Sequence, residues 1–172
     1  IGTIATVTAL SFGSVASPIH TNVADLTVNT AAAGGNQFIT ETNTLTALSL
    51  NAGTGDITLI TGGTISDADI NVDIVADALV VTVGGGGTFG TGAAAGAAIQ
   101  TTVNDLTVTT TANQFILETD GLTGLALNSG AGTIILTAGG AVTDVDGTSD
   151  IVAATANVTL NAAGDFGTAG QN

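Results

Sequence analysis

The chain has 172 residues, of which 14 are Asp or Glu and none is Lys or Arg, so its formal net charge is −14. Nucleic acid and anionic lipid are bound through cationic side chains, and both classes of partner are therefore excluded. The sequence has no cysteine for a disulfide or a thiolate metal site. Glycines interrupt its uncharged stretches, so we expect no membrane-spanning helix and no membrane insertion.

Short runs rich in Val, Ile and Thr predict an all-β chain, because these residues favour strands. Helix-favouring Lys, Arg and Met are absent, and 25 Gly are available for turns. In chain order, the first expected strands are the runs at 20–28, 37–42, 45–51, 56–61, 64–66, 72–76, 79–83 and 88–90. The apolar centres of these runs lie about eight to ten residues apart, a spacing that a two-sheet sandwich also gives.

Four sequence blocks occur twice, and tandem copies at a fixed period are typical of a solenoid rather than of a sandwich. Residues 11–30 return at 88–110, 36–42 at 113–119, 45–63 at 122–140 and 65–76 at 142–153, mostly 77 residues apart. We therefore predict one continuous parallel β-helix, a β-solenoid, over 1–172. Its expected parts are a partial repeat at 1–11, repeats at 12–88 and 89–165, and a partial repeat at 166–172. Each full repeat is expected to form roughly three to four coils.

The pattern LxLNAGxGDITLxxGGxI at 48–65, with its partner at 125–142, resembles the haemagglutinin-type repeats of large bacterial surface adhesins and secreted β-solenoid fibre proteins. The resemblance covers nearly the whole chain. It implies an extracellular, right-handed β-helical shaft that is a small part of a giant polypeptide. The period of 77 residues is longer than the single-coil repeat of that family, and the family normally carries some Lys, which this chain lacks.

Two clusters of three aspartates occupy matched places in the two repeats: Asp67, Asp69 and Asp73, and Asp144, Asp146 and Asp150. The second cluster lies in DVDGTSD, whose spacing partly matches a Ca²⁺-binding loop, whereas the first lacks the glycine of that loop. Carboxylates this close repel one another, and the chain has no basic residue to neutralise them. We therefore consider these six residues as ligands of Ca²⁺. The alternative is a solvated acidic turn that keeps the shaft soluble.

Other residues give no sign of a catalytic site. Glu41 and Glu118 are matched residues, but they are expected one repeat apart, about 15–19 Å along the shaft, which is too far for a catalytic carboxylate pair. We therefore expect no enzyme, and no cofactor other than Ca²⁺ is implied. The five phenylalanines are expected in the core or at the ends of coils.

These observations together favour a structural role outside the cell or at its surface. We expect a segment that stacks or continues head to tail into a filament or the shaft of a giant surface adhesin. Its partner is then a second copy of the chain or a longer tandem array, with contact to a cell surface or glycan in addition. The alternative is a surface-binding module for carbohydrate or ice, and an ice-binding face needs a matched pair of Thr on every coil. A polysaccharide-active enzyme is the least favoured alternative.

Overall fold

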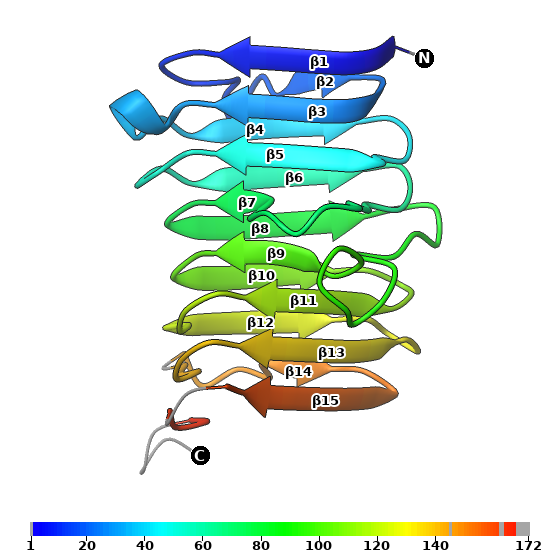
Figure 1. The fold of residues 1–172 in the computed structure, drawn as a ribbon, viewed down its shortest axis with the longest axis vertical. Coiled ribbons are helices and arrows are strands. Elements are labelled where there is room, and N and C mark those ends of the chain that lie inside the picture. Colours follow the sequence, from blue (N-terminus) through cyan, green and yellow to red (C-terminus); the bar gives the residue numbers. More distant parts are fainter. Residues whose placement is uncertain (1, 145, 162–163, 168–172) are drawn as a thin grey trace.

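The chain forms an all-β parallel solenoid, as predicted, and it has about seven coils with two strands in each coil (Figure 1). The structure is a computed structural model that describes residues 2–144, 146–161 and 164–167. Within this part of the chain, the only helical element is a single 3₁₀ turn, Ala31–Ala33. The same residues contain no helix long and apolar enough to cross a membrane.

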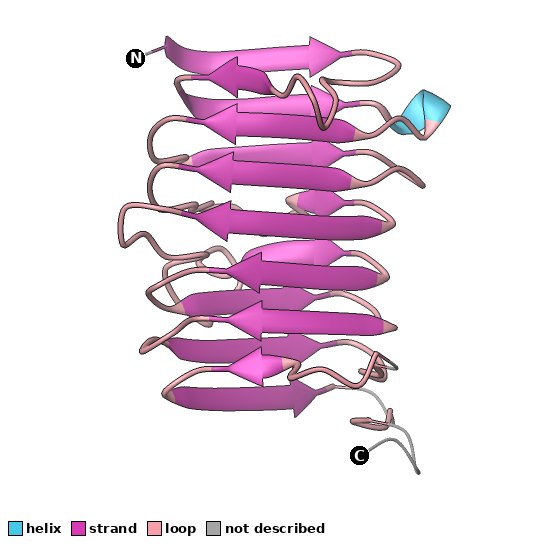
Figure 2. Cartoon of the chain, turned by 180° about the vertical axis from the view of Figure 1, so that it is seen from behind, coloured by secondary structure: helices cyan, strands magenta, loops and turns pink. Residues whose placement is uncertain are grey.

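The strands alternate between two sheets, which lie back to back along the shaft (Figures 1 and 2). Sheet A contains β1 (Gly2–Thr8), β3 (Val23–Asn29), β5 (Ala47–Asn51), β7 (Ile74–Val75), β9 (Ile99–Thr102), β11 (Gln114–Glu118), β13 (Thr133–Ala138) and β15 (Thr155–Leu160). Sheet B contains β2 (Ile19–Thr21), β4 (Gln37–Glu41), β6 (Ile57–Thr61), β8 (Ala78–Val83), β10 (Asp105–Thr109), β12 (Gly124–Asn128) and β14 (Ile151–Val152).

The core lies between the two sheets, because each strand turns alternate side chains inward. Stacked strands about 4.8 Å apart place these side chains in direct contact, as for the register partners Leu26 and Leu48. A second buried column follows the corners, where single bridges join Leu45 to Ile65 and Ile65 to Phe89. All five residues are at most 4% exposed.

Paired glycines allow the backbones of successive coils to touch at the corners after β6 and β13. A Cβ atom at Gly62 would lie 2.1 Å from the carbonyl oxygen of Thr42, and one at Gly139 would lie 2.1 Å from that of Thr119. No side chain fits in this space, so these corners require glycine.

Matched sequence blocks lie in opposite sheets. The two NQFIxET blocks form β4 in sheet B and β11 in sheet A, and the two DLTV blocks form β3 in sheet A and β10 in sheet B. Matched strands are seven strands apart along the chain. Because each coil has two strands, an odd offset moves a strand into the opposite sheet. Matched residues are therefore about half a turn apart around the axis, and three and a half coils, roughly 17 Å, apart along it. The repeat boundaries remain a prediction from the sequence.

The prediction that the phenylalanines fill the core or end the coils is wrong for two of them. Phe89 is buried, but Phe38 and Phe115 lie on the outer sides of β4 and β11. In β4 the first, third and fifth side chains are buried, so Gln37 and Glu41 point inward at its two ends. The inward polar groups form hydrogen bonds to the corners, and this sets the face on which the phenylalanine lies.

The coil arrangement predicts which outer residues can be cross-linked. Thr82 and Thr109 are exposed register partners in sheet B. Since stacked parallel partners lie about 4.8 Å apart, within the range of a disulfide, we expect Thr82→Cys with Thr109→Cys to form one under mild oxidation. The chain has no native cysteine, so the intact mass and a free-thiol assay report the bond directly.

The matched control combines Thr82→Cys with Thr159→Cys. Thr159 occupies the place matched to Thr82 in the sequence, but it lies in sheet A. This pair is expected to stay reduced. A disulfide in the control pair, with none between positions 82 and 109, would contradict the two-strand coil.

Candidate functional site

The first acidic cluster fills a gap in sheet A. Strand β7 has only two residues, and it pairs with only the last two residues of β5. The N–H group of Leu48, earlier in β5, has no strand partner on that side, and the carboxylate of Asp67 accepts its hydrogen bond at 2.8 Å. Asp67 also accepts the N–H of Asp69 at 2.9 Å. Its side chain therefore replaces the backbone carbonyl that a longer β7 would supply.

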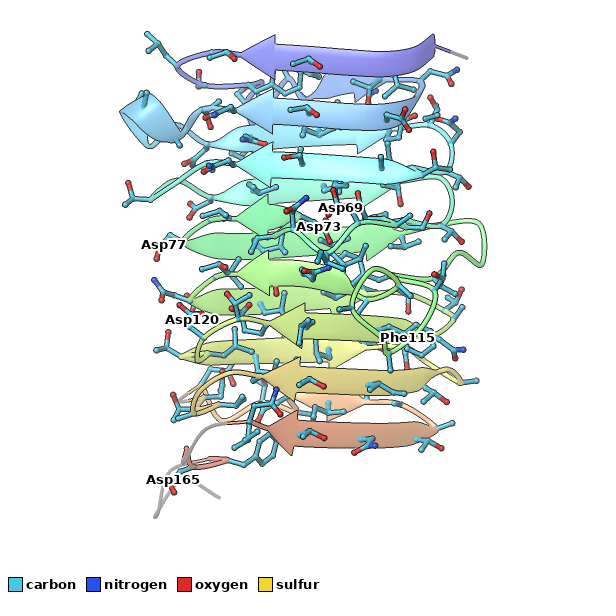
Figure 3. The ribbon with its side chains drawn as sticks, viewed as in Figure 1. Asp69, Asp73, Asp77, Phe115, Asp120 and Asp165 are labelled. Atoms are coloured by element: carbon cyan, nitrogen blue, oxygen red, sulfur yellow. The ribbon has the colours of Figure 1, made fainter. Side chains whose placement is uncertain are left out.

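Asp73 lies on the other side of the same gap. It is 2% exposed, and its carboxylate accepts the N–H of Gln100 in β9 at 2.7 Å. The Gln100 amide, oriented with its nitrogen toward the loop, donates to the carbonyls of Ile70 and Asn71 at 2.8 and 2.9 Å. Figure 3 shows Asp73 and the exposed Asp69 close together at the level of β7.

The three carboxylates of this cluster form a region of concentrated negative charge. One oxygen from each of Asp67, Asp69 and Asp73 lies within 4.8 Å of the other two. Burial, together with the neighbouring Asp67 and Asp69, raises the pKa of Asp73 to about 7. Hydrogen bonds from Asn71 lower the pKa of Asp69 below its ordinary value. An ionised carboxylate therefore lies beside a buried one, an arrangement that a proton or a cation stabilises.

The second cluster repeats this arrangement in sheet B, beside the equally short β14. Asp144 accepts the N–H of Leu125 in β12 at 3.0 Å, and Asp146 accepts that of Thr148 at 2.7 Å. The hydrogen bonds from Thr148 lower the pKa of Asp146. Burial, with Asp144 and Asp146 nearby, raises the pKa of Asp150. This cluster is more open than the first one and lies on the opposite face of the shaft.

The structure thus brings together the aspartates of each cluster that the sequence grouped. Their oxygen-only donor set suits a hard cation such as Ca²⁺, which takes six to eight oxygen ligands. Calcium binding itself stays a prediction. Sequence reasoning missed the second role of Asp67 and Asp144, which is to complete the hydrogen bonding of a sheet. No signal for it was present in the sequence, because 72–76 is predicted as a five-residue strand and the structure has only Ile74–Val75 there.

Glu41 and Glu118 are buried at matched corners of the core. The carboxylate of Glu118 accepts hydrogen bonds from the hydroxyl of Thr101 at 2.6 Å and from the N–H groups of Asp120 and Val103 at 3.3 and 3.4 Å. Burial, and a hydrogen bond with the side chain of Asp120, raise the pKa of Glu118 to about 7. Glu41 accepts the N–H groups of Val23 and Asn43, both at 3.2 Å. Both glutamates therefore bind the backbone of their corners, and they lie in different sheets.

Two buried glutamines complete the polar interior. The amide nitrogen of Gln37 donates to the carbonyl of Val28 at 3.3 Å, and that of Gln114 donates to the carbonyls of Val108 and Asn128 at 3.1 and 2.9 Å. The carbonyl oxygens of both amides have no partner within the described residues. The same inward amide at both places shows that the polar interior belongs to the repeated block.

Comparison with protein-family models, with curated proteins and with solved structures finds no match to this chain. The parallel solenoid that the haemagglutinin-type resemblance implies is present. Membership of that family has no support from these comparisons.

The burial of Glu118 predicts that stability falls as pH rises. With a pKa of about 7 in the folded state and near 4.5 in the unfolded chain, this group binds a proton more tightly when folded. The free energy of unfolding should then decrease as pH rises from about 4.5 to 7, by on the order of 2–3 kcal/mol. Chemical denaturation across this range measures it. Glu118→Gln, which imitates the protonated acid, should remove this contribution, while the contribution of Asp73, whose pKa is also raised to about 7, should remain.

Glu41→Gln is the matched control, because it introduces the same change at the corresponding corner. If Glu41→Gln flattened the profile as strongly as Glu118→Gln, the effect would belong to any buried glutamate rather than to the contacts with Thr101 and Asp120. An unchanged profile in Glu118→Gln would show that Glu118 does not cause the dependence.

Proposed function

We propose that this chain is a structural segment of an extracellular shaft, which continues along its axis as a filament or as part of a large surface adhesin. One observation carries the proposal: both sheets pair in parallel, in register and along one axis through the whole described length. The outermost described strands, β1 and β15, carry the same axial hydrogen-bonding groups as the strands between them. Further coils or a second copy can use these groups by strand addition.

Composition supports an extracellular, non-catalytic role. Without Lys or Arg, the chain has no cleavage site for trypsin-like proteases, and without Met or Cys it lacks the side chains most easily oxidised. The resemblance to haemagglutinin-type repeats points in the same direction. The carboxylates that the structure brings together accept hydrogen bonds from the backbone, a structural task that needs no catalysis.

Calcium is the cofactor that we propose for the two acidic clusters. Each cluster offers three carboxylates, and no basic side chain in the chain neutralises them. A bound cation would link the loop before each short strand to the coils above and below it. It would thereby stabilise the shaft at the two places where the sheet hydrogen bonding is incomplete.

A second candidate function is binding to a surface glycan, and one groove favours it. The groove, about 290 Å³ in volume, lies over the outer face of sheet B beside the second cluster. Gly124 and Ala126 line it, together with Asp105, Thr107 and Asp146. Ice binding is less favoured, because Ile60 interrupts the outer column that contains Thr40 and Thr82.

The shaft proposal is tested by electron microscopy of the concentrated segment. We expect filaments longer than the roughly 34 Å of one chain, with a meridional reflection near 4.8 Å. Compact particles of one chain length that do not elongate at any concentration would contradict axial continuation. In that case soluble glycan arrays would test the groove on sheet B.

The calcium proposal is tested by thermal unfolding at pH 8. Calcium at about 100 times its Kd should stabilise the wild type by about 2.7 kcal/mol for each site. We expect the double variant Asp73→Asn with Asp150→Asn to be less sensitive to calcium, and more stable than the wild type in chelator because a buried charge is removed.

Asp165→Asn is the control for this experiment, since it removes one charge outside both clusters. It should keep the full calcium response. A wild type that calcium does not stabilise would leave the clusters with their sheet-completing role alone.

A further inference from the structure

One asparagine lies in the middle of a strand, where the fold gives it no structural task. Asn157 is an exposed residue of β15, the last described strand of sheet A (Figure 1). Val158 and Leu160 of the same strand pack against the core, so Asn157 and Thr159 point outward. Both outward side chains are exposed, and neither forms a hydrogen bond with another described residue.

Elsewhere in this solenoid, asparagine side chains belong to the corners. Five of them accept backbone N–H groups that close the corners of the coils, at 2.9 or 3.0 Å: Asn29, Asn36, Asn51, Asn113 and Asn128. Asn157 lies away from the corners and accepts no such group from the described residues. The role that explains these five asparagines therefore does not explain Asn157.

The matched strand shows what the fold requires at this place. Val80 in β8 occupies the position matched to Asn157. Valine favours strands, whereas asparagine is depleted in them. The second block therefore departs here from the strand preference, without a described hydrogen bond in return. A departure of this kind points to a function rather than to the fold.

The three residues Asn157, Val158 and Thr159 form the triplet Asn-x-Thr, in which x is not proline. This triplet is the acceptor for N-linked glycans on the surfaces of secreted proteins. The 172 residues contain no other Asn-x-Thr or Asn-x-Ser triplet. Because side chains alternate along a strand, the amide and the hydroxyl both face solvent while the valine between them points inward. The exposure that an acceptor needs is thus present.

We propose that Asn157 is the attachment site of an N-linked glycan, which a transferase adds from a lipid-linked glycosyl diphosphate. The Nδ2 atom of Asn157 forms a bond to the anomeric carbon of the sugar and gives up one proton to the transferase. The bond between that carbon and the diphosphate oxygen breaks, and the diphosphate leaves with the electron pair. Thr159 is the residue through which the transferase recognises the acceptor. This inference rests on the extracellular location proposed above, since such acceptors are used in secreted proteins.

A glycan at Asn157 is compatible with growth of the shaft. Side chains of a strand stand roughly perpendicular to the sheet, so the glycan leaves the outer face of sheet A sideways. The axial hydrogen-bonding groups of β15 stay free for a further strand. The glycan would also add a bulky, solubilising group to one face of the shaft.

The test is secretion of the chain, behind an added signal peptide, from a host that carries out N-glycosylation. We expect the intact mass of the wild type to exceed that of the polypeptide by one glycan, and an amidase that cleaves N-linked glycans should remove the excess. Asn157→Gln and Thr159→Ala should each abolish the modification, whereas Thr159→Ser should retain it. A secreted wild type with the mass of the bare polypeptide would overturn the proposal, as would a glycan that persists in Asn157→Gln.

The matched control adds Val80→Asn to Asn157→Gln. This double variant has the same triplet at the matched place in sheet B, where the side chains of positions 80 and 82 are exposed. It should regain one glycan, which shows that the transferase of the host accepts a strand of this solenoid. Since the signal peptide directs secretion, the result does not depend on the proposed shaft. Filament growth of the unglycosylated chain tests the shaft separately.

Discussion

Axial pairing of parallel strands about 4.8 Å apart is the constraint on which the rest of this structure depends. It stacks each side chain directly on its neighbours in the coils above and below. Like charges stacked in this way destabilise a sheet, and the chain has no basic residue to place between them. Within the strands, acids are accordingly stacked on neutral residues. Asp25 pairs with Ala47, and Asp105 lies between Ala78 and Gly124.

Backbone N–H groups stabilise carboxylates in this chain, a role that Lys and Arg side chains often have in other proteins. Asp67, Asp144 and Glu118 each accept hydrogen bonds from backbone amides of neighbouring coils or corners. Such bonds favour the charged form of a carboxylate, whereas burial opposes it. For Glu118 burial prevails, and its pKa rises to about 7. Asp67 and Asp144 also lie beside further carboxylates, so a cation can act in addition to the amide hydrogen bonds.

The sequence predicts most of the fold and only part of the site. Alternating apolar residues and duplicated blocks are sufficient to predict a parallel solenoid, because few other folds contain tandem copies of short strands. The strand QFITE misleads the same reasoning, since Gln37 and Glu41 point inward while Phe38 points outward. Hydrophobicity alone places these residues on the wrong faces. Only the hydrogen bonds of the corners, which depend on the positions of neighbouring coils, decide their orientation.

The odd number of strands between matched blocks determines on which face of the solenoid each matched feature lies. With an even number, every copy of a block would face the same way, as suits a module that binds one flat surface. Seven strands place the two acidic clusters on opposite faces. In the longer array that we propose, each face would carry such a cluster at intervals of two blocks, roughly 34 Å. The two faces of such a shaft carry equivalent features. This property suits a component with neighbours on both sides better than a binding module with one binding face.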